Sequence, residues 1–159
     1  MSEKSDAVQD LFEEIRKINN RLRWLGDNLH PELGVTAPKR SLLIKLLREG
    51  PQTVPDLARE RLVSRQIVQT QINDLLKEGW VASRENPRHR RSSLISLTNT
   101  GKDLTLRMLY KENQIIEGSR SAPEIAEVKK LISGLASIRE HIERESYAEI
   151  NSGNTSGKI

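Results

Sequence analysis

Apolar residues recur at spacings of three and four along the first part of this 159-residue chain. Between Asp6 and about Leu29 they form one stripe, which predicts a long helix with a single apolar face. Gly26 interrupts the stripe late and marks a candidate bend, and residues 30–34 predict a break in the helix. The stripe consists of Val8, Leu11, Phe12, Ile15, Ile18, Leu22, Leu25 and Leu29.

The second and third helices are predicted by their caps as well as by their periodicity. Thr36 offers an N-cap with Pro38 in the first turn, and Gly50 followed by Pro51 ends the helix. The face that we expect to be buried holds Leu42, Leu43, Leu46 and Leu47.

A short third helix is predicted from Val54 to about Arg61. Thr53 can cap it, and Asp56 three residues later can complete a capping box. We expect three apolar side chains to pack inward from this segment: Leu57, Ala58 and Leu62.

The stretch from Val63 to Thr98 is the most informative part of the chain. A fourth helix, residues 64–78, ends at Gly79 and has an apolar side formed by Val68, Ile72, Leu75 and Leu76. The turn before it is so short that the third and fourth helices must cross steeply, as in a helix-turn-helix.

Two β-prone runs follow, at 80–83 and 93–97, and an arginine-rich loop at 84–91 joins them. A hairpin of this kind next to a helix-turn-helix is a wing. The predicted fold class is therefore mainly α with a small β-hairpin wing, a winged helix-turn-helix flanked by helices at both ends.

Thr98 can cap a fifth helix that reaches about Gly118, and Pro123 opens a sixth. Both carry apolar residues at helical spacing, whereas residues 151–157 are small and polar and predict a disordered tail. The predicted divisions are an N-terminal dimerisation helix (1–34), a winged domain (35–101), C-terminal dimerisation helices (102–150) and a disordered tail (151–159).

The apolar stripes of the terminal helices predict a dimer. One small winged domain offers little surface to cover them, whereas the first, fifth and sixth helices of two copies can interleave around a two-fold axis. The alternative is an intramolecular helical bundle, which the sequence leaves open.

Charge is distributed unevenly. The formal net charge is +4, and residues 37–101 hold 12 Lys/Arg against 6 Asp/Glu, so the basic excess lies around the predicted wing. Such clustering favours a polyanionic partner, although many basic proteins bind none.

Several classes of function are disfavoured. The chain has no cysteine, which excludes disulfides, thiolate metal sites and thiol redox sensing. The three histidines are scattered, and there is no phosphate-binding loop or nucleophile motif, so we expect neither an enzyme nor a bound metal or cofactor. No apolar run approaches the roughly 18 residues of a membrane span and no signal-peptide pattern is present, so we expect a cytoplasmic, nucleoid-associated protein without membrane contact.

Double-stranded DNA is the partner that the polar face and the wing favour. Arginine can contact guanine or phosphate, glutamine and asparagine amides pair with adenine, and arginines at a wing tip suit a narrow minor groove. The candidate DNA-binding residues are Ser64, Arg65, Gln66, Gln69, Thr70 and Asn73 of the fourth helix, and Arg88, Arg90 and Arg91 of the wing.

The sequence resembles the multiple antibiotic resistance regulator (MarR) family. The resemblance covers residues 5–148 and is carried by four motifs: residues 53–58 (TVPDLA), 75–81 (LLKEGWV), 87–92 (PRHRRS) and 97–101 (LTNTG). It implies a homodimer that binds a pseudo-palindromic operator, usually as a repressor and often released by a small anionic or aromatic ligand.

The wing departs from the family pattern. The family usually has an aspartate two residues before its key arginine, and here His89 precedes Arg91. Because imidazole groups titrate near neutral pH, we expect DNA binding to strengthen as the solution becomes more acidic. The family's ligand pocket lies near Trp24 and His30, which are candidate ligand-binding residues; packing of Trp24 in a dimer core is the alternative.

Two other functions remain open. A winged helix can serve as a protein-interaction module, but such a module has no need of Arg65 or the wing arginines. A nonspecific, architectural DNA binder is the other, and the amides of the fourth helix argue against it because they can read bases.

Overall fold

The computed structural model describes residues 3–29, 31–87, 89, 91–118 and 123–153. The chain divides into two compact units, residues 1–114 and 115–159, which are described separately. The elements, in chain order, are α1 (Glu3–Asn28), the 3-10 helix η1 (Pro31–Leu33), α2 (Ala37–Glu49), β1 (Gln52–Thr53), α3 (Val54–Glu60), α4 (Arg65–Lys77), β2 (Val81–Arg84), β3 (Leu94–Leu97), α5 (Asn99–Glu117) and α6 (Ile125–Gly153).

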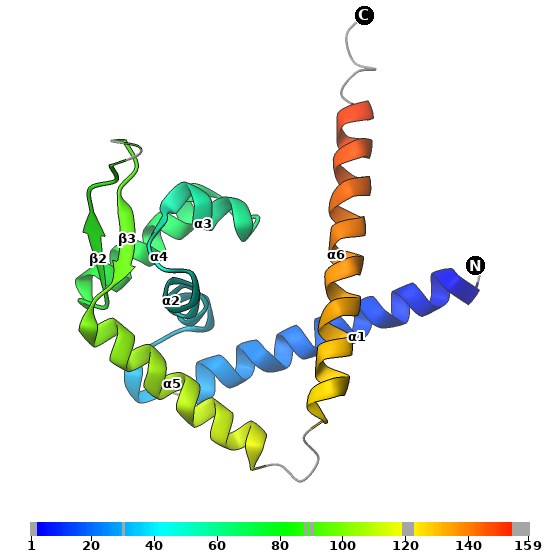
Figure 1. Ribbon diagram of the computed structural model, residues 1–159, viewed down its shortest axis with the longest axis horizontal. Coiled ribbons are helices and arrows are strands. Elements are labelled where there is room, and N and C mark those ends of the chain that lie inside the picture. Colours follow the sequence, from blue (N-terminus) through cyan, green and yellow to red (C-terminus); the bar gives the residue numbers. More distant parts are fainter. Residues whose placement is uncertain (1–2, 30, 88, 90, 119–122, 154–159) are drawn as a thin grey trace, which may run out of the picture. The chain divides into compact units, whose positions relative to one another are not determined.

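The core of the first unit surrounds α2, which Figure 1 shows nearly end-on between α3, α4, the hairpin and α5. Leu42 and Leu43 are fully buried and meet the inner faces of the neighbouring helices. The predicted inner face of α4 is confirmed, since Val68, Ile72 and Leu75 are also fully buried. This anchoring leaves the opposite face of α4 in solvent. The other buried apolar residues are Val35, Leu46, Leu57, Ala58, Val81, Ile95, Leu104 and Met108.

The sheet has three antiparallel strands in the order β1-β3-β2. The two predicted hairpin strands are confirmed within a residue, with Ala82 opposite Ser96. The strand β1 was not predicted. It pairs Thr53 with Leu94 but is only two residues long, too short for any alternating pattern to be read from the sequence.

The N-terminus of α2 is capped differently from the prediction. Thr36 occupies the N-cap position with an extended backbone, but its side chain makes no capping hydrogen bond. Instead the Ala37 amide donates to Oδ1 of Asp27, at 2.8 Å, from the last turn of α1. Gly26 remains helical and permits this approach, because a β-carbon there would lie 3.3 Å from the Ala37 β-carbon.

The prediction that Leu62 packs inward is wrong. Its side chain is 81% exposed, and its backbone is left-handed at φ 52°. The Leu62 and Val63 amides donate to the carbonyl oxygens of Arg59 and Ala58, which closes the turn between α3 and α4. Such a closure needs a positive φ, and this turns the Leu62 side chain away from the core.

The start of α5 is joined to the end of α4. As predicted, Thr98 caps α5, since its Oγ1 accepts a hydrogen bond from the Gly101 amide at 3.0 Å. The same hydroxyl donates to the Gly79 carbonyl oxygen at 2.7 Å, and the Thr98 amide donates to the Trp80 carbonyl oxygen. One threonine thus fixes α5 to the turn that follows α4.

The second unit consists of the end of α5 and helix α6. Helix α6 runs through Gly153 and so extends three residues into the stretch that was predicted to be a disordered tail. The polar residues 151–153 end this helix rather than begin the tail; residues 154–159 lie outside the described part of the chain. Among the described helices, none has the length and apolar character that a membrane span requires.

Candidate nucleic-acid interface

Helix α4 presents a polar face held in place by its buried side. Ser64 caps the helix as expected, its Oγ accepting a hydrogen bond from the Ile67 amide at 3.3 Å. The structure brings all six candidate residues of α4 together at the surface, and each is exposed: Ser64, Arg65, Gln66, Gln69, Thr70 and Asn73. Their contact with DNA stays a prediction.

Two side chains of this face form hydrogen bonds with a residue in an adjacent turn of α4. Nε2 of Gln69 donates to Oδ1 of Asn73 at 2.8 Å. The Thr70 hydroxyl donates to the Gln66 backbone carbonyl at 3.0 Å. Both pairs are four residues apart, so they lie one above the other on the helix surface.

Two side-chain contacts, one at the α3–α4 turn and one with α2, hold α4 in place. Nη1 of Arg61 donates to Oε1 of Gln71 at 2.9 Å, and burial lowers the pKa of the Arg61 guanidinium from its ordinary value. Nζ of Lys39 lies 3.1 Å from Oδ2 of Asp74 and joins α2 to α4. These contacts fix the helix that carries the polar face.

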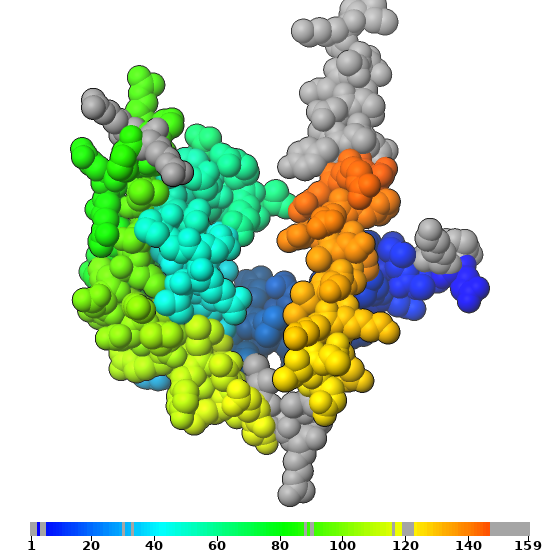
Figure 2. All heavy atoms as spheres, viewed as in Figure 1, coloured from blue at the N-terminus to red at the C-terminus, as the bar shows by residue number. Residues whose placement is uncertain are grey.

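The wing consists of β2, β3 and the loop between them. In Figure 2 its described residues (green) project beyond the helices of the winged domain. The His89 amide donates to the Asn86 carbonyl, and the Ser92 amide donates to the His89 carbonyl. Arg91 is exposed; the other two predicted wing contacts, Arg88 and Arg90, lie outside the described residues.

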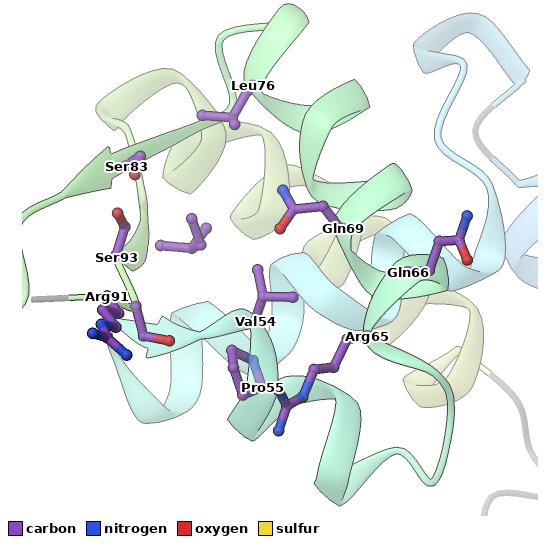
Figure 3. A pocket seen from close by; sticks show the side chains of 11 residues that line it. Val54, Pro55, Arg65, Gln66, Gln69, Leu76, Ser83, Arg91 and Ser93 are labelled. Atoms are coloured by element: carbon purple, nitrogen blue, oxygen red, sulfur yellow. The ribbon is translucent and has the colours of Figure 1, made fainter. Parts of the chain in front are cut away.

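A hollow of about 560 Å³ lies between α4 and the wing. Figure 3 shows Gln69 extending from α4 toward Ser83 of β2 and Ser93, which precedes β3, while Arg65 extends alongside Pro55. The described lining is Val54, Pro55, Arg65, Gln66, Gln69, Leu76, Ser83, Arg91, Ser92, Ser93 and Ile95. The sequence did not predict that Pro55 and the three serines line this hollow, because tertiary packing creates it. The one local signal was the position of Ser92 and Ser93 next to Arg91.

A smaller polar recess adjoins this hollow and contains His89. Asp56, Arg59 and Arg65 also line it, so the recess holds charges of both signs. A hydrogen bond from the Thr53 hydroxyl, helped by Arg59, lowers the pKa of the Asp56 carboxyl. The expected strengthening of DNA binding in acid stays a prediction.

The candidate ligand residues are not brought together in the described structure. Trp24 is 61% exposed, and His30 lies outside the described residues. A hollow nearby, at the end of α1 and the start of α2, is lined by Arg23, Asp27, Pro31, Gly34, Val35, Thr36 and Pro38. Trp24 is not among these lining residues.

Comparison with known proteins identifies the family. The family model described as MarR family matches residues 33–92, which contain α2, the helix-turn-helix and most of the wing. An uncharacterised protein of Mycobacterium tuberculosis is 35% identical over 121 residues, covering 76% of this chain and 82% of that protein. The chain belongs to the MarR family.

Other matches agree with membership of the MarR family. The uncharacterised HTH-type transcriptional regulator YwhA of Bacillus subtilis is 26% identical over 109 residues, 65% of this chain and 78% of YwhA. AbfR of Staphylococcus epidermidis has the same fold, with a TM-score of 0.78 at 18% identity over 89% of this chain and 97% of AbfR. AbfR bound to DNA matches with a TM-score of 0.67, 18% identity and coverage of 88% and 96%. The fold is that of DNA-binding transcriptional regulators, which are not enzymes.

Proposed function

We propose that this MarR-family protein is a sequence-specific transcriptional regulator that binds a pseudo-palindromic operator in double-stranded DNA. The observation that carries the proposal is the shared hollow. Arg65, Gln66 and Gln69 of α4 line one side of it, and Arg91 of the wing lines another. A recognition helix in the major groove with a wing arginine at the adjacent minor groove fits this arrangement.

Charge and structural likeness support the same partner. The basic excess falls within residues 37–101, the part of the chain that forms the helix-turn-helix and the wing. AbfR, which shares the fold, binds DNA. The protein therefore acts in the cytoplasm, on the chromosome.

The regulator acts as a homodimer. Helices α1, α5 and α6 each expose large apolar side chains that a second copy would cover: Val8, Ile15, Ile18, Leu22, Trp24, Leu106, Tyr110, Ile115, Ile125, Leu131, Ile132, Leu135 and Ile142. Isolated apolar side chains are common on surfaces, but rows of them along whole helices mark an interface. A two-fold dimer also presents two recognition helices to two half-sites.

Repression with release by a small ligand is the mode of action that the family resemblance favours. An anionic or aromatic effector suits the hollow beside Arg23, between the end of α1 and the start of α2. Thiol oxidation is not the signal, because the chain contains no cysteine.

The test is selection of bound sequences from genomic fragments, followed by competition with unrelated duplex DNA and footprinting. The proposal expects an inverted repeat with half-sites about one helical turn apart, protected by two copies of the protein. Binding that unrelated DNA competes away at equal concentration would contradict sequence-specific regulation and favour an architectural role.

A further inference from the structure

We propose that Gln69 and Asn73 read the operator as one coupled amide unit rather than as two independent side chains. The inference rests on the proposed function and names residues that set its sequence specificity. It starts from the 2.8 Å hydrogen bond between the two amides, which forms without DNA.

The pair lies where base edges would be read. Both side chains are exposed on the outer face of α4, and Gln69 also lines the hollow between this helix and the wing. Figure 3 shows the Gln69 amide extending from α4 into that space. Since the inner face of α4 is fully buried at Val68 and Ile72, the helix cannot rotate to hide the pair.

The hydrogen bond changes what each amide offers to DNA. A free glutamine or asparagine amide pairs with adenine through one donor and one acceptor of the same group. In the joined pair, Gln69 has given one N–H to Asn73, and Asn73 has used one lone pair of its oxygen. Gln69 keeps one N–H and its oxygen, and Asn73 keeps both N–H groups and one lone pair. Because the hydrogen bond holds the two amides in contact and in fixed relative orientation, the joined groups suit neighbouring base pairs.

The hydrogen bond also limits the conformational entropy lost on binding. Long polar side chains lose rotamer freedom when an interface orders them, and two side chains that already hold each other lose less. Removal of either partner frees the other to change rotamer. The loss of one amide should therefore remove most of the contribution of both.

A double-mutant cycle tests the coupling. Affinity for the selected operator is measured for the full-length protein, Gln69→Ala, Asn73→Ala and the double variant. Each single substitution should weaken binding roughly tenfold, as expected for a lost base contact. The double variant should be weakened by about the same factor, and not by the roughly hundredfold that independent contacts would give. All four proteins should fold alike, because both side chains are exposed.

Gln66 supplies the matched control. It lies on the same outer face, and within the described residues it forms no side-chain hydrogen bond with Asn73. The fold-losses of operator affinity caused by Gln66→Ala and Asn73→Ala should therefore multiply in the variant that carries both. Selected-sequence profiles add a second readout, since Gln69→Ala and Asn73→Ala should lose preference at the same base positions.

The outcomes separate the inference from the proposed function. The coupled unit would be overturned if the losses of operator affinity in Gln69→Ala and Asn73→Ala multiplied in the double variant. It would also be overturned if either single substitution weakened binding less than twofold. In both cases sequence-specific binding would stand. Failure of the unaltered protein to prefer any sequence would overturn the proposed function, and the coupled unit with it.

Discussion

Gly101 packs directly against the backbone of Trp80: a β-carbon at position 101 would lie 1.9 Å from the Trp80 carbonyl oxygen. Trp80 follows the turn that ends α4, and Gly101 lies in the first turn of α5. Together with the Thr98 hydrogen bonds, this contact fixes the end of α4 to the start of α5.

Gly101→Ala should therefore destabilise the protein by at least about 2 kcal/mol, because backbone atoms cannot move aside as a flexible side chain does. Thr100→Ala, an exposed position in the same turn, is the control and should change stability little. Chemical denaturation at fixed protein concentration measures both. Equal stabilities of the two variants would show that α5 and Trp80 are not in close contact.

Leu62→Gly should stabilise the protein by roughly 0.5–1 kcal/mol. Leu62 adopts a left-handed backbone that costs a side-chain-bearing residue about 1–2 kcal/mol, and glycine avoids most of this cost. Few contacts are lost, because the side chain is exposed. Val63→Gly, next to it at an ordinary φ, should destabilise instead, and thermal unfolding distinguishes the two. A destabilised Leu62→Gly variant would mean that the turn has another conformation.

Glu112→Gln should cost about 2–3 kcal/mol. Glu112 of α5 is almost entirely buried and forms a bidentate ion pair with Arg40 of α2. Loss of one partner leaves the other charge poorly compensated, although partial exposure of Arg40 moderates the cost. Glu13→Gln breaks the exposed Arg16–Glu13 pair and should have no measurable effect on the midpoint of urea unfolding. Similar midpoints for the two variants would argue against a buried pair.

Asp56 should make stability depend on pH in the acid range. Its pKa in the folded protein is lowered from 3.8, chiefly by the hydrogen bond from Thr53. The ionised carboxyl therefore stabilises the fold fully at a pH above 3.8, and this stabilisation is lost as the pH falls through the lowered pKa of the folded protein. Asp56→Asn should cost roughly 0.5 kcal/mol at pH 6, a small figure because the carboxylate is nearly half exposed. The difference between the two proteins should shrink as the pH falls below 3.8. A difference that stays constant between pH 6 and 3 would exclude this carboxylate as the cause.

Local signals predicted the helices, and contacts distant in the sequence escaped prediction. The Thr53 and Thr98 caps act within three residues, and the inner face of α4 follows from helical periodicity. In contrast, Asp27 caps a helix that begins ten residues later, and β1 exists only because β3 lies beside it. Leu62 was misjudged because the geometry of the turn determines where its side chain lies, and periodicity does not.

The candidate site divides in the same way. The polar face of α4 could be predicted because its residues share one helix. The hollow could not, since Ser83 and Ile95, which both line it, face each other only through the pairing of β2 with β3. The hydrogen bond between Gln69 and Asn73 fits their four-residue spacing, but the sequence did not predict that these two amides bond to each other.

Binding measured across salt concentrations tests whether α4 and the wing together form a DNA-reading surface. Operator and scrambled duplexes are compared for the unaltered protein, Arg65→Ala, Arg91→Ala and the control Arg139→Ala on α6. Arg65→Ala should reduce operator preference by about tenfold. Arg91→Ala should weaken binding to both duplexes and lower the salt slope by about one unit, while Arg139→Ala changes neither. Unaltered preference in Arg65→Ala together with an unaltered slope in Arg91→Ala would contradict the claim.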